Sequence, residues 1–357
     1  MKVAVFFGGR SSEHDISVLT GILTVNSIKE HEVFPIYIGK DGRWRYSPKF
    51  TSVNALDKRF KEVCLHPFDK GLFTLGGKRI CNLDVCLICC HGAYGEDGAL
   101  AGVLEHSDIP YAPGGVLSGA VGMDKVTQKR VFRDAGISVL DFFSVEKFDY
   151  REGIFDYSAA LKDKFPVIVK PSSAGSSIGI GIARDYAEFF AVADKAFAYD
   201  DRIIVEHALQ DYKEYNCAVL GMGDTLVVSQ IEQPVSKKEF LDYSEKYSYS
   251  GGAQRIFPAE VDENLRELMQ EQAKLAFRAL KCYGVARVDF LYDGQLYLNE
   301  INTVPGSMSS YLFDYDKINF SALSKSLIDI AIKAHTEKSK LKRATDGQLL
   351  LDTRLLK

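Results

Sequence analysis

The sequence predicts an α/β protein of two or three domains, and three observations support this fold class. The chain has 357 residues, more than one hydrophobic core usually serves at about 150 residues per domain. Strand and helix signals alternate through its first third, as in a sheet of parallel strands covered by helices. From Met123 a helical stretch leads to an apolar strand and a loop rich in glycine and serine, which indicates a second domain from about residue 119.

The N-terminal region begins with a strand at 3–7 (VAVFF) and a helix at about 13–30, followed by strands at 33–39 and 84–90. This order predicts the beginning of a doubly wound α/β domain. The last strand (DVCLICC) contains three of the seven cysteines. We interpret these thiols as small core hydrophobes and expect no disulfides, because a redox pair would need a polarised helix N-terminus that this run lacks.

Later elements continue the α/β pattern. Strands are predicted at 203–209 and 214–222, and amphipathic helices at about 262–281 and 319–335. The polar, tyrosine-rich segment at 233–255 is too long for a plain connection, and we expect it to be a mobile loop over a site.

The charge balance argues against large charged partners. The chain has 44 basic and 48 acidic residues and a net charge of −4, so no global field gathers nucleic acid or an anionic membrane. The first apolar run is too short for a signal peptide, and no segment approaches the roughly eighteen apolar residues of a membrane span. We therefore expect a cytoplasmic protein with small-molecule substrates.

A C-terminal hairpin, ARVDFLYDGQLYLNEIN, carries the strongest chemical signal. A two-residue turn at Asp293-Gly294 would pair position 289 with 298 and position 287 with 300. Side chains alternate along a strand, so one face of this ribbon would present Arg287, Asp289, Glu300 and Asn302. Oxygen donors in this arrangement suit Mg²⁺, which takes its remaining ligands from nucleotide phosphates and water. The alternative is a solvated edge hairpin, but the apolar residues between these positions leave little of it plainly exposed.

A nucleotide also needs a phosphate site, and no Walker motif is present, since GLFTLGGK has the wrong spacing. The loop from Ser172 to Gly181 can instead supply consecutive backbone N–H groups. Lys125 and Lys170 are candidate counter-charges for phosphates, although each lysine alone is typical of a surface residue.

Two N-terminal loops are further candidates. FFGGRSSEHD places two glycines between a strand and a helix, an arrangement whose free N–H groups bind anions. Glu13 in this segment either interacts with the helix dipole or anchors a substrate ammonium. HGAYGEDG (91–98) leaves a buried strand at its carboxyl end, where open sheets bind ligands. His91 in this loop is either a core histidine or a site residue, and its position favours the site.

Together these segments resemble the D-alanine:D-alanine ligase family from the first strand to about residue 315. The matching motifs, in family order, are FGGRSSEHDIS, HGAYGEDG, MDK, VKPSSAGSSIGI, VEHAL with KEYN, DYSEKY, ARVDF and NEINTVPGS. The resemblance implies an ATP-grasp fold with an N-terminal α/β domain at 1–118, a central subdomain at 119–210 and a C-terminal subdomain at 211–340. The lid would be the loop at 233–255, and the tail would comprise 341–357.

The resemblance also implies roles for individual residues. ATP would be held by phosphate-binding, adenine-binding and ribose-binding residues, namely Lys125, Lys170, Ser177, Lys246, Glu206, His207, Leu209 and Glu214. Two Mg²⁺ ions, or Mn²⁺, would be bound by Asp289, Glu300 and Asn302. Glu13 would hold the ammonium of the first D-alanine and His91 would lie near its carboxylate, while Arg287 and the Gly306 N–H would form the oxyanion site.

The implied reaction joins two D-alanines for peptidoglycan precursors through a D-alanyl phosphate, with closure of the lid. Tyr247, with Glu13 and Ser176, matches the network that ties the lid to the N-terminal domain, and a tyrosine there is similar to ligases that make D-alanyl-D-alanine. One departure follows NTVPG: many members of the family have a threonine and a later Ser-Leu pair that hold the carboxylate of the second substrate, whereas this chain has Tyr311-Leu312 in the corresponding place. Ser309 and Ser310 are candidate substitutes.

Two alternatives stay open, together with the oligomeric state. The second substrate could be D-serine or D-lactate, which the altered 307–312 segment allows and Tyr247 disfavours. A non-catalytic nucleotide sensor is the other alternative, but such a protein would be expected to lose the metal ligands or phosphate lysines that this chain retains. Homodimers are common in the family, so we expect a homodimer.

Overall fold

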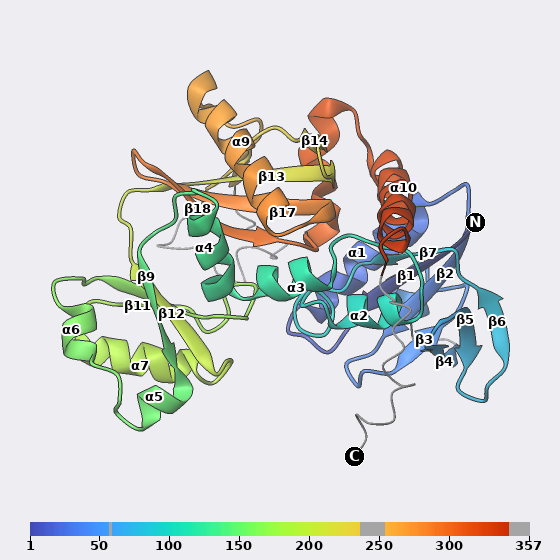
Figure 1. Cartoon of the computed structure of the whole chain (residues 1–357), viewed down its shortest axis with the longest axis horizontal. Helices are drawn as coiled ribbons and strands as arrows, with labels where there is room; N and C mark the ends of the chain where they lie inside the picture. The colour runs from blue at the N-terminus through green and yellow to red at the C-terminus, as the bar shows by residue number, and fades with distance from the viewer. Residues whose placement is uncertain (57–58, 236–253, 343–357) are drawn as a thin grey trace, which may run out of the picture.

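The computed structural model describes residues 1–56, 59–235 and 254–342, which form three sheets and a short ribbon (Figure 1). The first sheet has the order β6-β5-β4-β3-β2-β1-β7-β8. Its strands are β1 (Lys2–Gly8), β2 (Glu32–Ile38), β3 (Trp44–Tyr46), β4 (Lys61–His66), β5 (Asp69–Thr74), β6 (Arg79–Asn82), β7 (Val85–Ile88) and β8 (Tyr111–Ala112). The predicted parallel sheet comprises β2, β1, β7 and β8. The remaining strands extend it in antiparallel fashion.

Helices cover both faces of the first sheet, because its central strands are apolar on both sides. Val3 and Val5 of β1 pack toward α1 (His14–Ser27) and α10 (Phe320–Ser339). Ala4 and Phe6 pack toward α2 (Ala99–His106). The predicted helix at 13–30 is confirmed but shorter. Cys86, Cys89 and Cys90 are buried free thiols, which confirms their interpretation as core residues, and burial raises the pKa of Cys89 to about 12.

The second sheet is antiparallel, with the order β11-β10-β12-β9. Its strands are β9 (Phe142–Glu146), β10 (Val167–Pro171), β11 (Gly181–Ala183) and β12 (Arg202–His207). Its helices are α5 (Lys147–Arg151), α6 (Tyr157–Leu161) and α7 (Tyr186–Ala196). A separate core, which includes Val169, Phe189 and Val205, joins the sheet to α7.

The third sheet is antiparallel, with the order β14-β13-β17-β18. Its strands are β13 (Lys213–Met222), β14 (Thr225–Val228), β17 (Tyr283–Tyr292) and β18 (Leu296–Asn302), and the ribbon is β15 (Gln233–Val235) with β16 (Gln254–Ile256). The associated helices are α3 (Val116–Met123), α4 (Lys125–Asp134) and α9 (Glu263–Ala279). Phe132, at the end of α4, packs in the core of this sheet although the second sheet follows it in sequence.

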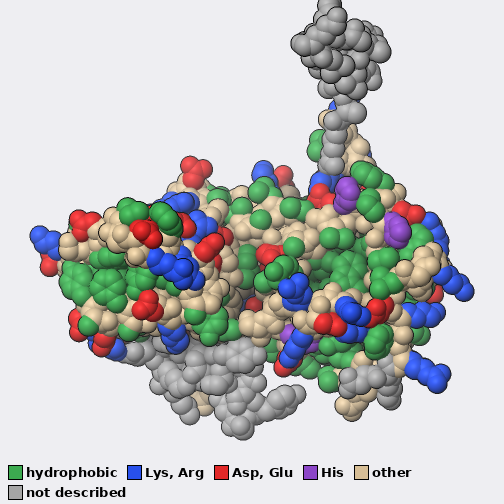
Figure 2. All heavy atoms as spheres, turned by 90° about the horizontal axis from the view of Figure 1, so that it is seen from below, with side chains coloured by type: hydrophobic (Ala, Val, Ile, Leu, Met, Phe, Trp, Pro, Cys, Tyr) green, Lys and Arg blue, Asp and Glu red, His purple; other side chains and the backbone are tan. Residues whose placement is uncertain are grey.

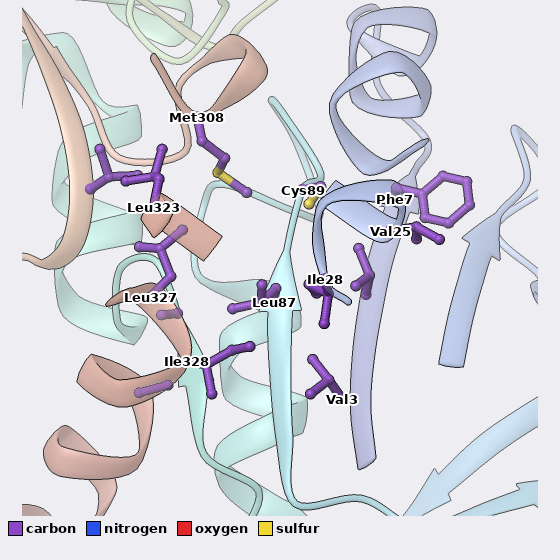
Figure 3. Packing of buried hydrophobic residues seen from close by; sticks show 14 of the residues in the cluster. Val3, Phe7, Val25, Ile28, Leu87, Cys89, Met308, Leu323, Leu327 and Ile328 are labelled. Carbon is purple, nitrogen blue, oxygen red and sulfur yellow. The ribbon is translucent and has the colours of Figure 1, made fainter. Parts of the chain in front are cut away.

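The first and third sheets share one core (Figure 3). Met308, from the segment between β18 and α10, and Leu327 of α10 pack in the same cluster as Leu87 of β7. On the side of the third sheet, this core includes Leu220 and Val285. The segment that follows β18 therefore joins the third sheet to the first.

The surface carries charges of both signs. Figure 2 shows Lys and Arg side chains interspersed with Asp and Glu on the face that it presents. Within the described ranges, no helix is long and apolar enough to cross a membrane.

Candidate active site

Two adjoining pockets lie where the three sheets meet. The outer pocket lies between the second and third sheets and is lined by residues that include Lys125, Lys170, His207, Leu209 and Asn299. The inner pocket faces the first sheet and is lined by residues that include Glu13, His91, Arg287, Gly306 and Tyr311. Both pockets share the wall made by Ser176, Glu214, Asn216, Asp289 and Glu300. A ligand in one pocket can thus contact a ligand in the other.

The hairpin β17–β18 forms the shared wall, but its predicted register is wrong by two residues. Asp289 pairs with Glu300 and residue 287 with Asn302, whereas residue 292 pairs with 296. The loop therefore has one more residue than a two-residue turn, and a bulge next to Asp289 adds the second. A shift of two residues preserves the face of each side chain. The four polar side chains consequently stay on one face, as the sequence predicts.

Both carboxylates of the hairpin, Asp289 and Glu300, are paired with a cation. Arg287 donates to both oxygens of Asp289 at 2.7 Å, and the Asn302 amide donates to Asp289 Oδ2 at 3.2 Å. Glu300 Oε2 lies 3.3 Å from Lys125 Nζ. Two facing carboxylates and an amide oxygen are hard donors that fit Mg²⁺ together with phosphate oxygens. Of the described residues, no group of three His, Cys, Asp or Glu side chains forms a metal cage of its own, so nucleotide oxygens would have to complete the coordination.

Behind the outer pocket, a buried ion triad fixes Lys170. Glu206 lies 2.8 Å from the Lys170 ammonium and 2.5 Å from that of Lys129. Burial favours the neutral carboxyl, but the two ammonium groups outweigh it and hold the pKa of Glu206 at about 2. Burial also lowers the pKa of Lys129. The Glu206 side chain is thus taken up by lysines behind the pocket wall and does not line the pocket.

The Ser172–Gly181 loop bends over the shared wall and contains two consecutive residues with left-handed backbone. Ser176 and Ser177 have positive φ values of 53° and 58°, and consecutive residues of this kind direct N–H groups to one side. The Lys125 ammonium donates to the Ala174 carbonyl at 2.9 Å and holds the base of the loop. A Cβ at Gly175 would lie 2.5 Å from Glu13 Oε2, so this close approach to the first sheet requires glycine.

In the inner pocket, Glu13 accepts a hydrogen bond from the Ser176 hydroxyl, which joins the N-terminus of α1 to the loop. His91 Nδ1 lies 2.6 Å from the Val304 carbonyl, and Nε2 lies 2.9 Å from Thr20 Oγ1. The carbonyl can only accept, so Nδ1 carries the proton and the ring is neutral when Nε2 accepts from Thr20. Burial lowers the pKa of His91, in agreement with that state. His91 thus lines the pocket and also fixes the strand end next to Gly306.

Glu96 lies beside Glu13 and accepts from the backbone N–H groups of Gly92 at 3.2 Å and Val304 at 3.0 Å. Burial raises the pKa of Glu96 to about 7, and the charge of Glu13 adds to the effect. The inner pocket therefore concentrates negative charge that a ligand ammonium would offset. Glu96 was not predicted from the sequence, although it lies in the HGAYGEDG loop.

Beyond Gly306 the backbone is unusual. Ser307, Met308 and Ser309 all have left-handed φ values between 48° and 53°. The Ser307 N–H donates to Thr20 Oγ1 at 2.9 Å. Ser309 is fully buried, and neither it nor Ser310 lines the inner pocket. The structure thus gives no support for Ser309 or Ser310 as substitutes for the altered family residues.

Tyr311 instead reaches the inner pocket. Its hydroxyl donates to Glu232 Oε2 at 2.9 Å, and the Asn216 amide donates to the same oxygen at 3.1 Å. Arg255 of β16 lies 3.5 Å from Glu232 Oε1 through Nε, with its Cζ 4.9 Å from the centre of the Tyr311 ring. We call Glu232, Arg255 and Tyr311 the inner triad. Sequence reasoning missed Glu232 and Arg255.

The remaining predicted residues fall into two groups. His207, Leu209, Glu214 and Ser177 all line the outer pocket, and their nucleotide-binding role stays a prediction. Lys246 and Tyr247 lie outside the described residues, as does most of the predicted lid at 233–255. Lys129 was missed, although Val126, Lys129 and Phe132 form a buried helical stripe that could have indicated it.

Comparison with known proteins identifies the family. The family model "D-ala D-ala ligase N-terminus" matches residues 2–114, and "D-ala D-ala ligase C-terminus" matches residues 131–330. The chain belongs to the D-alanine–D-alanine ligase family. A D-alanine–D-alanine ligase from Thermosipho africanus is 35% identical over 95% of this chain and 95% of its own length. One from Geobacillus kaustophilus is 36% identical over 94% of this chain and 96% of its own length.

Solved structures agree on the fold. The D-alanine-D-alanine ligase of Coxiella burnetii matches with a TM-score of 0.84 and 28% identity, covering 100% of this chain and 98% of its own. The VanG D-Ala:D-Ser ligase of Enterococcus faecalis matches with a TM-score of 0.81 and 30% identity, covering 92% and 99%. This family member therefore has the predicted ATP-grasp fold, which is common to relatives with different second substrates.

Proposed function

We propose that this protein joins two D-alanines into D-alanyl-D-alanine at the expense of ATP, for the synthesis of peptidoglycan precursors in the cytoplasm. The observation that carries the proposal is the shared wall, where Asp289 and Glu300 face both pockets at once. A nucleotide in the outer pocket would present its phosphates to an amino acid in the inner pocket across these carboxylates. The full-length likeness to D-alanine–D-alanine ligases supports the same reaction.

In the outer pocket, Lys125 and Lys170 would contact the ATP phosphates beneath the N–H groups of Ser176 and Ser177. The Glu206 triad supports this role, because it fixes Lys170 before any ligand binds. Asp289, Glu300 and Asn302 would hold two Mg²⁺ ions, and Mn²⁺ would fit the same oxygen donors. When bound, these ions offset the charge of the phosphates. Adenine and ribose would lie against the His207–Leu209 side, beside Glu214.

In the inner pocket, Glu13 would bind the ammonium of the first D-alanine with His91 near its carboxylate. The Ser176 bond to Glu13 would then couple amino-acid binding to the loop over the phosphates. Arg287 and the Gly306 N–H would stabilise the oxyanion that develops when the acyl group is attacked. The neutral His91 supports that geometry, because its bond to the Val304 carbonyl fixes the backbone just before Gly306.

The reaction would proceed in two steps. A carboxylate oxygen of the first D-alanine attacks the γ-phosphorus of ATP, ADP leaves, and a D-alanyl phosphate forms. The amine of the second D-alanine attacks the acyl carbon, phosphate leaves, and the attacking nitrogen loses a proton. Both steps develop charge on oxygen atoms, so positioned cations and N–H donors are sufficient without a covalent enzyme intermediate.

A second candidate keeps the first step and changes the nucleophile to D-serine or D-lactate. Tyr311 favours keeping this candidate, because it replaces a residue that in many family members helps hold the second substrate. The likeness to a D-Ala:D-Ser ligase has a similar TM-score to the likeness to a D-alanine-D-alanine ligase. Both candidate functions use the same outer-pocket residues, because they differ only in the second substrate.

The test is ADP release with Mg-ATP and D-alanine, alone or with D-serine, D-lactate or L-alanine, with products identified by mass. We expect D-alanine alone to give the dipeptide, and the double variant Asp289→Asn, Glu300→Gln to lose at least roughly a thousandfold in rate. A product that requires D-serine or D-lactate would establish the second candidate. ATP binding without turnover of any acid would show a non-catalytic sensor. Sedimentation of the same sample would test the expected homodimer.

A further inference from the structure

The second amino acid needs a partner for its carboxylate, and the usual hydroxyl is absent from this chain. Tyr311 occupies the place of the serine in the Ser-Leu pair of many family members. Its own hydroxyl is used by Glu232 at 2.9 Å. Ser309 is fully buried, and neither Ser309 nor Ser310 lines the inner pocket. A different side chain of the inner pocket is therefore a candidate for this role.

Two arginines line the inner pocket within the described part of the chain, Arg287 and Arg255. Arg287 holds both oxygens of Asp289 at 2.7 Å in a bidentate pair. The contact of Arg255 is looser: its Nε lies 3.5 Å from Glu232 Oε1, and its side chain is 51% exposed. A guanidinium has five N–H donors, so these contacts leave both terminal amino groups of Arg255 able to receive a carboxylate.

The surroundings of Arg255 also fix its position. The ring of Tyr311 lies under the guanidinium at 4.9 Å, a contact that favours a cation over an aromatic face. Glu232 is 1% exposed, and it accepts from Asn216 and Tyr311 in addition to its pair with Arg255. These donors offset the buried negative charge, which would otherwise repel a second carboxylate in the pocket.

We propose that Arg255 binds the carboxylate of the second amino acid, held in place by Glu232 and Tyr311. This proposal rests on the proposed ligase function and assigns part of its second substrate site. The inner triad replaces a short hydroxyl side chain with a long charged one that reaches from β16. The recognised group is an α-carboxylate, so the triad selects free amino acids over their amides.

The experiment is a competition between two nucleophiles. D-Alaninamide lacks the carboxylate and can act only as the second substrate, so the ratio of dipeptide to dipeptide amide reports on carboxylate recognition alone. We expect Arg255→Met to shift this ratio toward the amide by roughly tenfold to a hundredfold, the ratio that loss of a hydrogen bond to a charged group gives. Arg255→Lys should shift it less, because lysine keeps the charge but not the fork.

A matched control is Arg278→Met in α9, where the arginine donates to the Gly223 carbonyl away from both pockets. It should keep the wild-type ratio. Because the ratio is internal to each sample, it does not depend on how much of a variant is folded. An unchanged ratio in Arg255→Met overturns the carboxylate role while the ligase function stands. No dipeptide from the wild-type protein overturns the ligase function and this proposal together.

Discussion

The two pockets differ in how the charges of their side chains are balanced. Behind the outer pocket, Glu206 is enclosed by Lys129 and Lys170, and opposite charges hold the wall together without any ligand. In the inner pocket, Glu13 and Glu96 lie side by side, and the pKa of Glu96 is raised to about 7, by burial and by its acidic neighbour. The outer pocket is thus preformed, whereas the inner pocket carries an imbalance that a substrate ammonium can remove. Binding energy is therefore available where the amino acid enters.

The largest expected effect tests the preformed wall. Glu206→Gln should lower the free energy of unfolding by about 4 kcal/mol, because it leaves two buried ammonium groups without their counter-charge. Urea denaturation would measure the change. The matched control is Glu271→Gln, whose ion pair with Lys274 is exposed on α9; it should change stability by less than about 0.5 kcal/mol. A loss below about 1 kcal/mol for Glu206→Gln would contradict the role assigned to the buried triad.

The next effect tests the imbalance in the inner pocket through pH. The pKa of Glu96 rises on folding from 4.5 to about 7, so the folded state binds the proton more tightly than the unfolded chain. Proton binding at Glu96 therefore contributes fully to stability below about pH 4.5, and this contribution is lost as the pH rises to about 7. At 1.36 kcal/mol per pH unit, the total loss is up to about 3 kcal/mol. Urea midpoints at about pH 5 and about pH 8 should show this loss in the wild type but not in Glu96→Gln. If the urea midpoint depended on pH equally in the wild type and in Glu96→Gln, Glu96 would not be the source of the loss of stability.

A third prediction sharpens the contrast from the substrate side. Glu13→Gln should raise the KM of the first D-alanine by roughly thirtyfold, or about 2 kcal/mol, because a charged partner of the ammonium is lost. It should also bring the pKa of Glu96 closer to its ordinary value, since the Glu13 charge contributes to the shift. Steady-state kinetics across pH would measure both changes. Asp15→Asn is the matched control, because Asp15 lies in the same helix turn but is exposed and paired with Lys40. A similar rise of KM in Asp15→Asn would contradict a specific contact between Glu13 and the substrate ammonium.

The smallest expected effect concerns the backbone of the inner pocket. Ser307 has a φ of 48°, which costs a residue with a Cβ about 1–2 kcal/mol. Ser307→Gly should therefore stabilise the protein by about 0.5 kcal/mol after the greater flexibility of unfolded glycine is subtracted. Ser310→Gly, outside the left-handed turn, should destabilise it by a similar amount. Thermal unfolding of the pair would measure both signs, and the same sign in both variants would exclude strain at Ser307.

Local sequence patterns predicted most of the strands and helices. The features that they did not predict depend on contacts between residues far apart in the sequence. The apolar strands and the polar face of β17–β18 follow from side-chain alternation, which is a local property. The register was wrong for two reasons: the turn has three residues where two were predicted, and the bulge beside Asp289 adds one more that the turn residues do not encode. The sequence predicts no strand between 39 and 84, because the short strands that extend the sheet there in antiparallel fashion have weak patterns.

The site residues also divide into those that local motifs predict and those that only the fold brings together. Residues in compact motifs, such as Lys170 and His91, could be selected because neighbouring glycines and strands define their position. Glu232 and Arg255 could not, because each is an ordinary charged residue until Tyr311, more than fifty positions later, brings them into one cluster. Lys129 was overlooked for a related reason: a lysine on a polar helix is usually solvated, and its burial depends on Glu206 of another strand.

The distribution of cores has a consequence for how the molecule can open. The first and third sheets cannot separate without exposing the apolar side chains that they share, Met308 and Leu327 among them. The second sheet has its own core, and polar links such as Asp124 to Arg202 and Lys129 to Glu206 join it to the rest. The first and third sheets would therefore act as one rigid base, and the floor that positions the amino acids would remain intact from one catalytic cycle to the next.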